Sequence, residues 1–271
     1  MAVEWQYMID IRPTWVNAQQ SANWEASVRR HITWISQTQS GRILLNSIKF
    51  HKKWVPISPY DGTQGACNAY ADAKAGKAKD GHDYGAAVFY SPHLFQRGTA
   101  CHPDSALENR GLLPDEILYH ELVHALRRVS GKRAWAGASG GLLRYDSNEE
   151  FNAILVTNIY VTDPTNRIKT GLRADHQDGA PLQAELATSF SFFESSMDTF
   201  RLVKQLVADH PGLTGALAKV PAAFNPIAAF VQDPAEAEKR SRSSRALIRD
   251  ADGWATAVKA SLARWARMVG L

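Results

Sequence analysis

The sequence has no long hydrophobic run, no strong excess of charge of either sign and no internal repeat. Its longest apolar stretches, residues 153–156 and 222–231, are far shorter than the roughly 20 residues that span a bilayer, so we expect no transmembrane segment. A net charge of +4 over 271 residues is mild, and a solvated basic face explains it better than a nucleic-acid interface does. We therefore expect a globular protein without a nucleic-acid partner.

The first residues, MAVEWQYMIDI, lack the basic region and apolar core of a secretory signal peptide. We expect a protein that is made in the cytoplasm and either stays there or leaves by a route without a cleaved signal.

Cysteine is scarce. The two that occur, Cys67 and Cys101, do not have the spacing of a zinc knuckle. Two unpaired thiols are the expected state, and a single disulfide is the alternative if the protein works in an oxidising compartment.

What the sequence does contain is an HExxH motif, formed by His120, Glu121 and His124. On a helix, residues four apart lie one above the other, so both imidazoles can bind one zinc ion. Glu121 would lie beside the open coordination position, which makes it a candidate general base. Three fixed letters match by chance in roughly one or two chains per hundred, so the surrounding residues must decide.

The motif lies in a segment that predicts a buried helix over residues 113–131. Pro114 suits the first helical position, acidic residues follow it, and Gly131 is a plausible left-handed terminator. Apolar side chains cover nearly all the remaining circumference, which is typical of a buried helix.

A catalytic zinc usually has three protein ligands and an open position. An HExxHxxGxxH extension is absent, because Arg127 occupies the position of its glycine and Ser130 that of its third histidine. A second helix, predicted over residues 148–160, opens instead with Glu149 and Glu150. Adjacent helical residues point about 100° apart, so only one of them can be the third ligand, and the spacing alone does not say which.

The N-terminal part predicts helices over residues 18–39, with Ser21 as a candidate cap, and 41–53. Residues 54–60 predict a strand, and Pro56 is expected to confine it to a sheet edge. Residues 61–84 resemble an exposed excursion.

Residues 86–91, AAVFYS, are the clearest strand. The last third, about residues 183–271, is predicted to be mostly helical, and the stripe of large apolar residues over 251–269 to pack into the core. We expect one domain over residues 1–271, with its core at about 18–165.

LYHELVHALRRVSG and YDSNEEFNAILVTNIY together resemble bacterial effector zinc metallopeptidases. These include the peptidase domains of type VI secretion spike proteins and Rhs-type toxins, and more distantly the catalytic domain of anthrax lethal factor. The shared pattern, an HExxH helix ending in Gly and a helix opening with Asn-Glu and an acid-Phe pair, covers roughly residues 41–160. In it the ligand is the glutamate before Phe, here Glu150, and Glu149 would support a ligand or lie at the surface. Tyr145 is in a place comparable to an oxyanion-stabilising tyrosine of lethal factor, although a structural role explains it nearly as well.

The resemblance implies a zincin of the α+β class, mostly helical, with a small sheet against the HExxH helix. Its Zn2+ would be held by His120, His124 and Glu150 and would polarise the scissile carbonyl, while Glu121 would pass a proton from water to the leaving amine. Strand 86–91 would bind the substrate as an extra strand. The implied activity is that of an endopeptidase with a protein or peptide substrate. An immunity protein and a secretion-system carrier that exports it into a target cell would be further partners.

Two alternatives stay open at this point. One is a binding module with a structural zinc, or none, whose functional surface is the helical C-terminal part. The other keeps the enzyme and changes its substrate to cell-wall peptides. Among the remaining histidines, His82, His93 and His102 precede the motif in loops, and each is better explained as a surface residue.

Overall fold

The computed structural model describes residues 6–13, 17–60, 67–78, 80–99, 101, 112–132, 145–167, 170–174, 181–196 and 198–243. In these ranges the fold is mostly helical with one small mixed sheet, which confirms the predicted α+β class. The helices are α2 (Ala18–Gln37), α3 (Gln39–Phe50), α4 (Pro114–Val129), α5 (Asn148–Thr162), α6 (Thr199–Asp209), α7 (Pro211–Leu217) and α8 (Pro226–Gln232). The strands are β1 (Ile9–Ile11), β2 (Val55–Ser58), β3 (Tyr70–Ala73) and β4 (Ala86–Phe89), and short 3-10 turns occur at Pro92–Phe95, Ala184–Leu186 and Ser191–Glu194.

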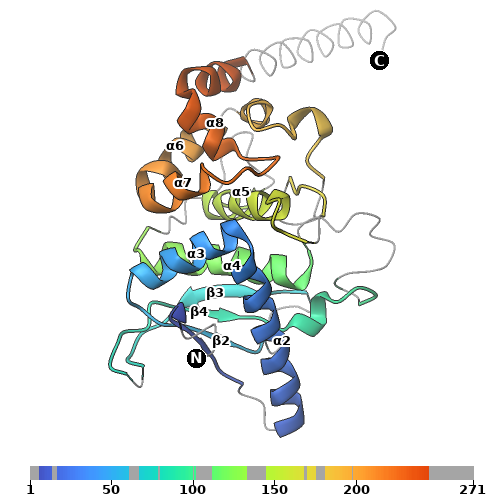
Figure 1. The fold of residues 1–271 in the computed structure, drawn as a ribbon, viewed down its shortest axis with the longest axis vertical. Helices are drawn as coiled ribbons and strands as arrows, with labels where there is room; N and C mark the ends of the chain where they lie inside the picture. The colour runs from blue at the N-terminus through green and yellow to red at the C-terminus, as the bar shows by residue number, and fades with distance from the viewer. Residues whose placement is uncertain are drawn as a thin grey trace, which may run out of the picture.

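The sheet has the order β1-β2-β4-β3, with β1, β2 and β4 parallel and β3 antiparallel to β4. Helices α3 and α4 lie on one face of it, and α5 lies across α4 on the side away from the sheet (Figure 1). Helices α6, α7 and α8 form a further layer beyond α5 (Figure 1). The predicted small sheet against the HExxH helix is therefore present.

Strand β2 corrects one prediction, because it lies inside the sheet and not at its edge. Its backbone bonds to β1 are made by the residues on either side of Pro56: the Val55 amide donates to Met8 O at 3.0 Å, and the Arg12 amide donates to Ile57 O at 2.8 Å. On the other side, the pairing with β4 begins at Ile57. Trp54 also bridges Tyr84 on that side, where the Gly85 amide donates to Trp54 O at 3.2 Å. Pro56 therefore lies between two paired segments, and its missing N–H interrupts the hydrogen bonds only locally.

Strand β3 corrects two more predictions. It lies within residues 61–84, which were expected to be an excursion without a strand, and it covers the edge of β4 through the pairs from Tyr70 opposite Phe89 to Ala73 opposite Ala86. AAVFYS is thus an interior strand with neighbours on both sides. It has no free edge to which a substrate strand could add.

The two cysteines also differ from expectation. Cys67 and Cys101 form a disulfide, with Cα atoms 5.1 Å apart. The bridge closes a segment that contains β3 and β4, so it ties the edge of the sheet to the chain that follows the 3-10 turn at Pro92–Phe95.

Helices α2 and α3 meet at a tight corner. Asn17, and not Ser21, caps α2, because its side chain accepts from the amides of Gln19 and Gln20. Thr38 ends α2 and caps α3 by accepting from the Gly41 amide at 2.9 Å. A Cβ at Gly41 would meet Ile35 O at 1.9 Å, so this corner requires glycine.

Helix α4 is the centre of the fold. Every residue from Asp115 to Arg127 is buried, and the helix contacts α2, α3, α5, β3 and β4. Pro114 opens it, and Gly131 follows it with a φ of 70°, so the predicted start, end and burial are confirmed.

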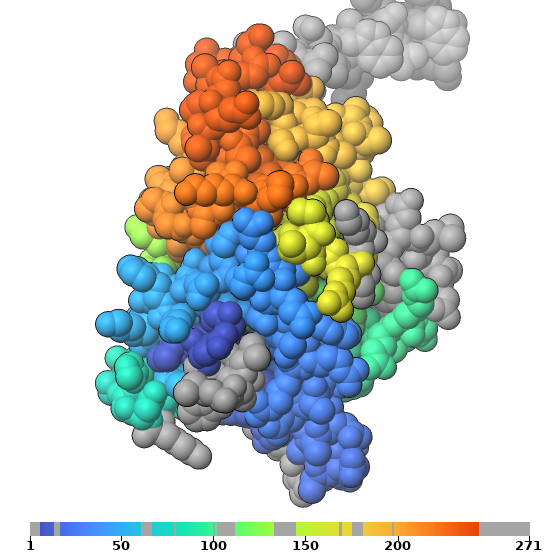
Figure 2. All heavy atoms as spheres, viewed as in Figure 1, coloured from blue at the N-terminus to red at the C-terminus, as the bar shows by residue number. Residues whose placement is uncertain are grey.

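The C-terminal layer is helical as predicted as far as residue 243, and the stripe at residues 251–269 lies outside the described residues. On the face seen in Figure 2 the C-terminal helices pack directly on the α3 region, in agreement with the contact between α3 and α7. None of the helices in the described ranges has both the length and the hydropathy of a membrane span.

Candidate metal centre

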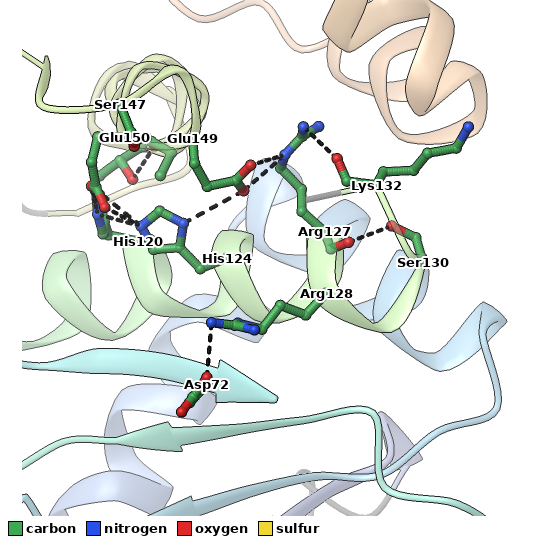
Figure 3. A network of polar contacts seen from close by, with 12 residues as sticks. Asp72, His120, His124, Arg127, Arg128, Ser130, Lys132, Ser147, Glu149 and Glu150 are labelled. Carbon is green, nitrogen blue, oxygen red and sulfur yellow. Dashed lines mark hydrogen bonds and ion pairs between the residues drawn. The ribbon is translucent and has the colours of Figure 1, made fainter. Parts of the chain in front are cut away.

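Helices α4 and α5 bring three donor groups to one point. His120 Nε2 and His124 Nε2 are 3.1 Å apart, and Glu150 Oε2 lies 3.1 Å from the first and 3.3 Å from the second. Both histidines come from one face of α4, and Glu150 comes from the first turn of α5 (Figure 3). Over the described residues this is the group of His, Cys, Asp and Glu side chains that can hold a metal ion.

The spacing of these atoms fits zinc. In a tetrahedral site with ligand bonds of 2.0–2.1 Å, neighbouring ligand atoms lie about 3.3 Å apart, close to the separations observed here. The described residues supply three donors, and a structural zinc site normally has four. The donor set therefore fits an ion with one open position better than a closed structural site.

The two imidazoles have opposite pKa shifts. Burial lowers the pKa of His120 to about 3, with Glu150 opposing this and His124 adding to it. Burial also opposes charge on His124, but Glu150 and Glu149 outweigh it and raise its pKa to about 10. Two imidazoles in contact cannot both hold a proton easily.

Glu149 and Glu150 face different partners, as expected for neighbours on a helix. Ser147 caps α5 by accepting from the Glu150 amide at 3.2 Å, which fixes the first turn. Burial raises the pKa of Glu150, but His124 and His120 outweigh this and hold it far below its usual value. Of the two acids, Glu150 is the one that the structure places against both histidines.

Glu149 lies behind His124 and is fully buried, so it is not a surface residue. Its Oε1 is 3.6 Å from His124 Nδ1. The Nε–H of Arg127 donates to both of its carboxylate oxygens, at 2.8 and 2.9 Å. Burial raises the pKa of Glu149, but His124 and Arg127 outweigh this and lower it.

Glu121 is buried beside the edge strand β3. Burial raises its pKa to about 7, while His124 and a hydrogen bond from the Ala71 backbone oppose the shift. Its Oε2 has no hydrogen-bond partner among the described residues. A carboxylate with a pKa near neutrality and a free oxygen is suited to accept a proton.

The remaining candidates lie elsewhere. The ring of Tyr145 is buried edge-on against Phe151, with centroids 5.2 Å apart, and its proposed oxyanion role stays a prediction. His82 is exposed and 3.3 Å from Asp80, and His93 is exposed on the 3-10 turn. His102 lies outside the described residues.

Sequence reasoning missed two charged residues near this centre. Arg173 is buried, and its charge lowers the pKa of His120 and opposes the rise at Glu121. Arg127 pairs with Glu149, whereas the sequence marked it only as the residue in place of a glycine. Neither role has a local signal, because Arg173 lies in a polar loop and the Arg127 partner is 22 residues away.

Residues 12–184 match the family Peptidase_M91, described as an effector protein. The match spans more than half of the chain, contains all the residues of the donor cluster and ends before α6. Comparison with curated proteins and with solved structures gave no match.

Proposed function

Because the chain belongs to the Peptidase_M91 effector family, we propose that it is a zinc-dependent endopeptidase that cleaves a protein substrate. The observation that carries the zinc dependence is the convergence of His120 Nε2, His124 Nε2 and Glu150 Oε2 within 3.3 Å of one another. A bound Zn2+ would supply Lewis acidity toward the scissile carbonyl and the attacking water.

A carboxyl group of the protein, that of Glu121, would transfer the proton from the attacking water to the leaving amine. The Oε2 of Glu121, which has no hydrogen-bond partner among the described residues, would accept a proton as water attacks, and the same carboxyl would return it to the leaving amine. The burial that raises the Glu121 pKa to about 7 favours both steps, because the group then gains and loses a proton readily near neutral pH.

Strand β3 would bind the substrate. It is an edge strand in the described sheet, its Ala71 backbone reaches Glu121, and Asp72 on it pairs with Arg128 of α4 at 2.9 Å. Figure 3 shows this ion pair joining the strand to the helix that carries the histidines. An extended peptide added to β3 would lie along α4. This assignment replaces the earlier one to residues 86–91.

We further propose that the protein is exported into a target cell. The effector family supports it, and the Cys67–Cys101 disulfide is compatible with work outside the reducing cytoplasm. The proposed partners are a secretion-system carrier and an immunity protein that protects the producing cell.

The test is hydrolysis of an unfolded protein by zinc-loaded wild type and by Glu121→Gln. The variant should keep one zinc per chain and lose activity by at least about 100-fold, the usual effect of removing a general base. Glu116→Gln, on the same buried helix, is the matched control and should remain active. Near-wild-type turnover by Glu121→Gln would refute the mechanism, and cleavage of peptidoglycan peptides in place of unfolded protein would move the enzyme to the cell wall.

A further inference from the structure

A chain of charged groups, buried except for Asp209 at its far end, leads from His124 away from the donor cluster. Glu149 Oε1 lies 3.6 Å from His124 Nδ1, the Arg127 guanidinium binds Glu149, and Asp209 Oδ2 lies 3.7 Å from Arg127 Nη2. The side chains of Arg127 and Glu149 are 2% and 0% exposed. Figure 3 shows the first two links, with Glu149 between His124 and Arg127.

Arg127 holds three parts of the fold at once. Its Nε–H donates to Glu149 at the start of α5, and its Nη2 donates to Lys132 O, just beyond α4, at 2.8 Å. The same Nη2 faces Asp209, the last residue of α6. A planar guanidinium held on several sides cannot rotate freely, so the carboxylate that it binds is also fixed in place.

The fixed carboxylate has a consequence for the imidazole. An imidazole that binds an ion through Nε2 must carry its proton on Nδ1, and a carboxylate behind Nδ1 selects that tautomer and the ring orientation. Glu149 is the group on the Nδ1 side of His124. The position of Glu149, and hence of the His124 ring, therefore depends on Arg127.

We propose that Arg127 and Asp209 are positioning residues for the metal centre, acting through Glu149 on His124. Asp209 lies beyond residue 184, where the family match ends, so helix α6 takes part in the site from outside the matched region. The inference rests on the proposed zinc site.

A purely structural role for the pair is the competing explanation. Buried ion pairs often contribute little net stability, and removing one partner destabilises a protein whether or not a metal is near. Stability alone therefore does not distinguish the two explanations. Zinc affinity and the electronic spectrum of a bound metal do, because they respond to ligand orientation.

The experiment compares wild type with Arg127→Lys, which keeps the charge and loses the planar fork, and with Asp209→Asn, which keeps the shape and loses the charge. Zinc affinity is measured by chelator competition, and the ligand geometry by the visible spectrum of the Co2+-substituted protein. We expect Arg127→Lys to bind zinc 10- to 100-fold more weakly, as typical for a group that orients a ligand, and to shift the Co2+ bands. Asp209→Asn should also weaken zinc binding and shift the Co2+ bands, but less than Arg127→Lys does.

Arg128→Lys is the matched control, because Arg128 is the next residue on α4 and its pair with Asp72 leads away from the histidines. Its zinc affinity and Co2+ spectrum should equal those of wild type. If Arg127→Lys does not fold, Asp209→Asn decides alone, since that side chain lies at the end of α6. Unchanged affinity and spectrum in both variants, with wild type binding zinc, would overturn the inference. Failure of wild type to bind zinc would instead overturn the proposed function.

Discussion

Helices α4 and α5 both open with two adjacent acids, Asp115–Glu116 and Glu149–Glu150, in their first turns. The sequence signal is the same in both places, since acidic side chains complement the positive end of a helix. Three of the four residues are buried, and Glu150 is nearly so. The two pairs nevertheless have opposite electrostatic character.

The pair on α4 has hydrogen-bond partners without charge, and the charge of Arg173 only partly offsets the effect of burial on Glu116. Asp115 accepts from the Tyr160 hydroxyl at 2.6 Å, and Glu116 accepts from the Thr170 hydroxyl and the Leu113 amide. Burial raises the pKa of Asp115, and it raises that of Glu116 to about 8. Near neutral pH Glu116 therefore favours its protonated form, and burial shifts the pKa of Asp115 in the same direction.

The pair on α5 has cationic partners. Glu149 meets Arg127, and Glu150 meets His120 and His124. These groups outweigh burial and lower both pKa values. The groups that face a buried carboxylate, and not its place on a helix, therefore decide whether it is charged, and only a charged carboxylate binds a metal well.

The largest effect is expected at Glu150. Glu150→Ala should weaken zinc binding by more than about 100-fold and abolish hydrolysis, because two imidazoles alone hold the ion poorly. Zinc content after dialysis against a weak chelator measures this. Glu116→Gln is the corresponding change on α4, and this variant should keep its zinc. Loss of zinc from it would show that the acidic pair on α4 also affects metal binding.

A second effect, on stability, is expected at Glu149. Glu149→Ala leaves Arg127 buried without its carboxylate, which typically costs about 3–5 kcal/mol of unfolding free energy. From the sequence alone we would expect a loss of only about 1 kcal/mol of unfolding free energy, because the substitution removes a negative charge from the first turn of α5. Urea denaturation of the metal-free protein measures the loss, and a change below 1 kcal/mol would show that the ion pair contributes little.

A third effect, which leaves zinc binding unchanged, is expected at Glu116, and it depends on pH. Its pKa of about 8 in the folded protein exceeds the roughly 4.3 of an unfolded glutamate. The stability from its bound proton is complete below the unfolded value and is lost as pH rises toward 8, at up to about 1.4 kcal/mol per pH unit. Metal-free Glu116→Gln should therefore lose less stability than wild type between pH 5 and 8 in urea denaturation. Parallel losses would place the Glu116 pKa near its ordinary value.

Local patterns were enough to predict the two central helices. Pro114 and Gly131 mark the ends of α4, and Ser147 caps the start of α5 at Asn148, because capping is local chemistry. The helix spacing of His120 and His124 likewise places both rings on one face.

Features that depend on distant partners were not predictable. Strand β3 is short and contains Asp72, and its pairing with β4 makes it a strand. The disulfide forms because the Cα atoms of Cys67 and Cys101 lie 5.1 Å apart, a distance that depends on the tertiary fold and cannot be inferred from the spacing of the cysteines in the sequence. The partners of Arg127 come from α5 and α6, so no local pattern could assign its role.

The most direct test of the zinc site is anomalous diffraction at the zinc edge from crystals of the zinc-loaded protein. If the proposed zinc site is right, one strong peak will lie about 2.0–2.2 Å from His120 Nε2, His124 Nε2 and a carboxylate oxygen of Glu150. The Asp115–Glu116 pair should show none. A peak bound by Glu149 in place of Glu150, or a peak with four protein ligands, would contradict it.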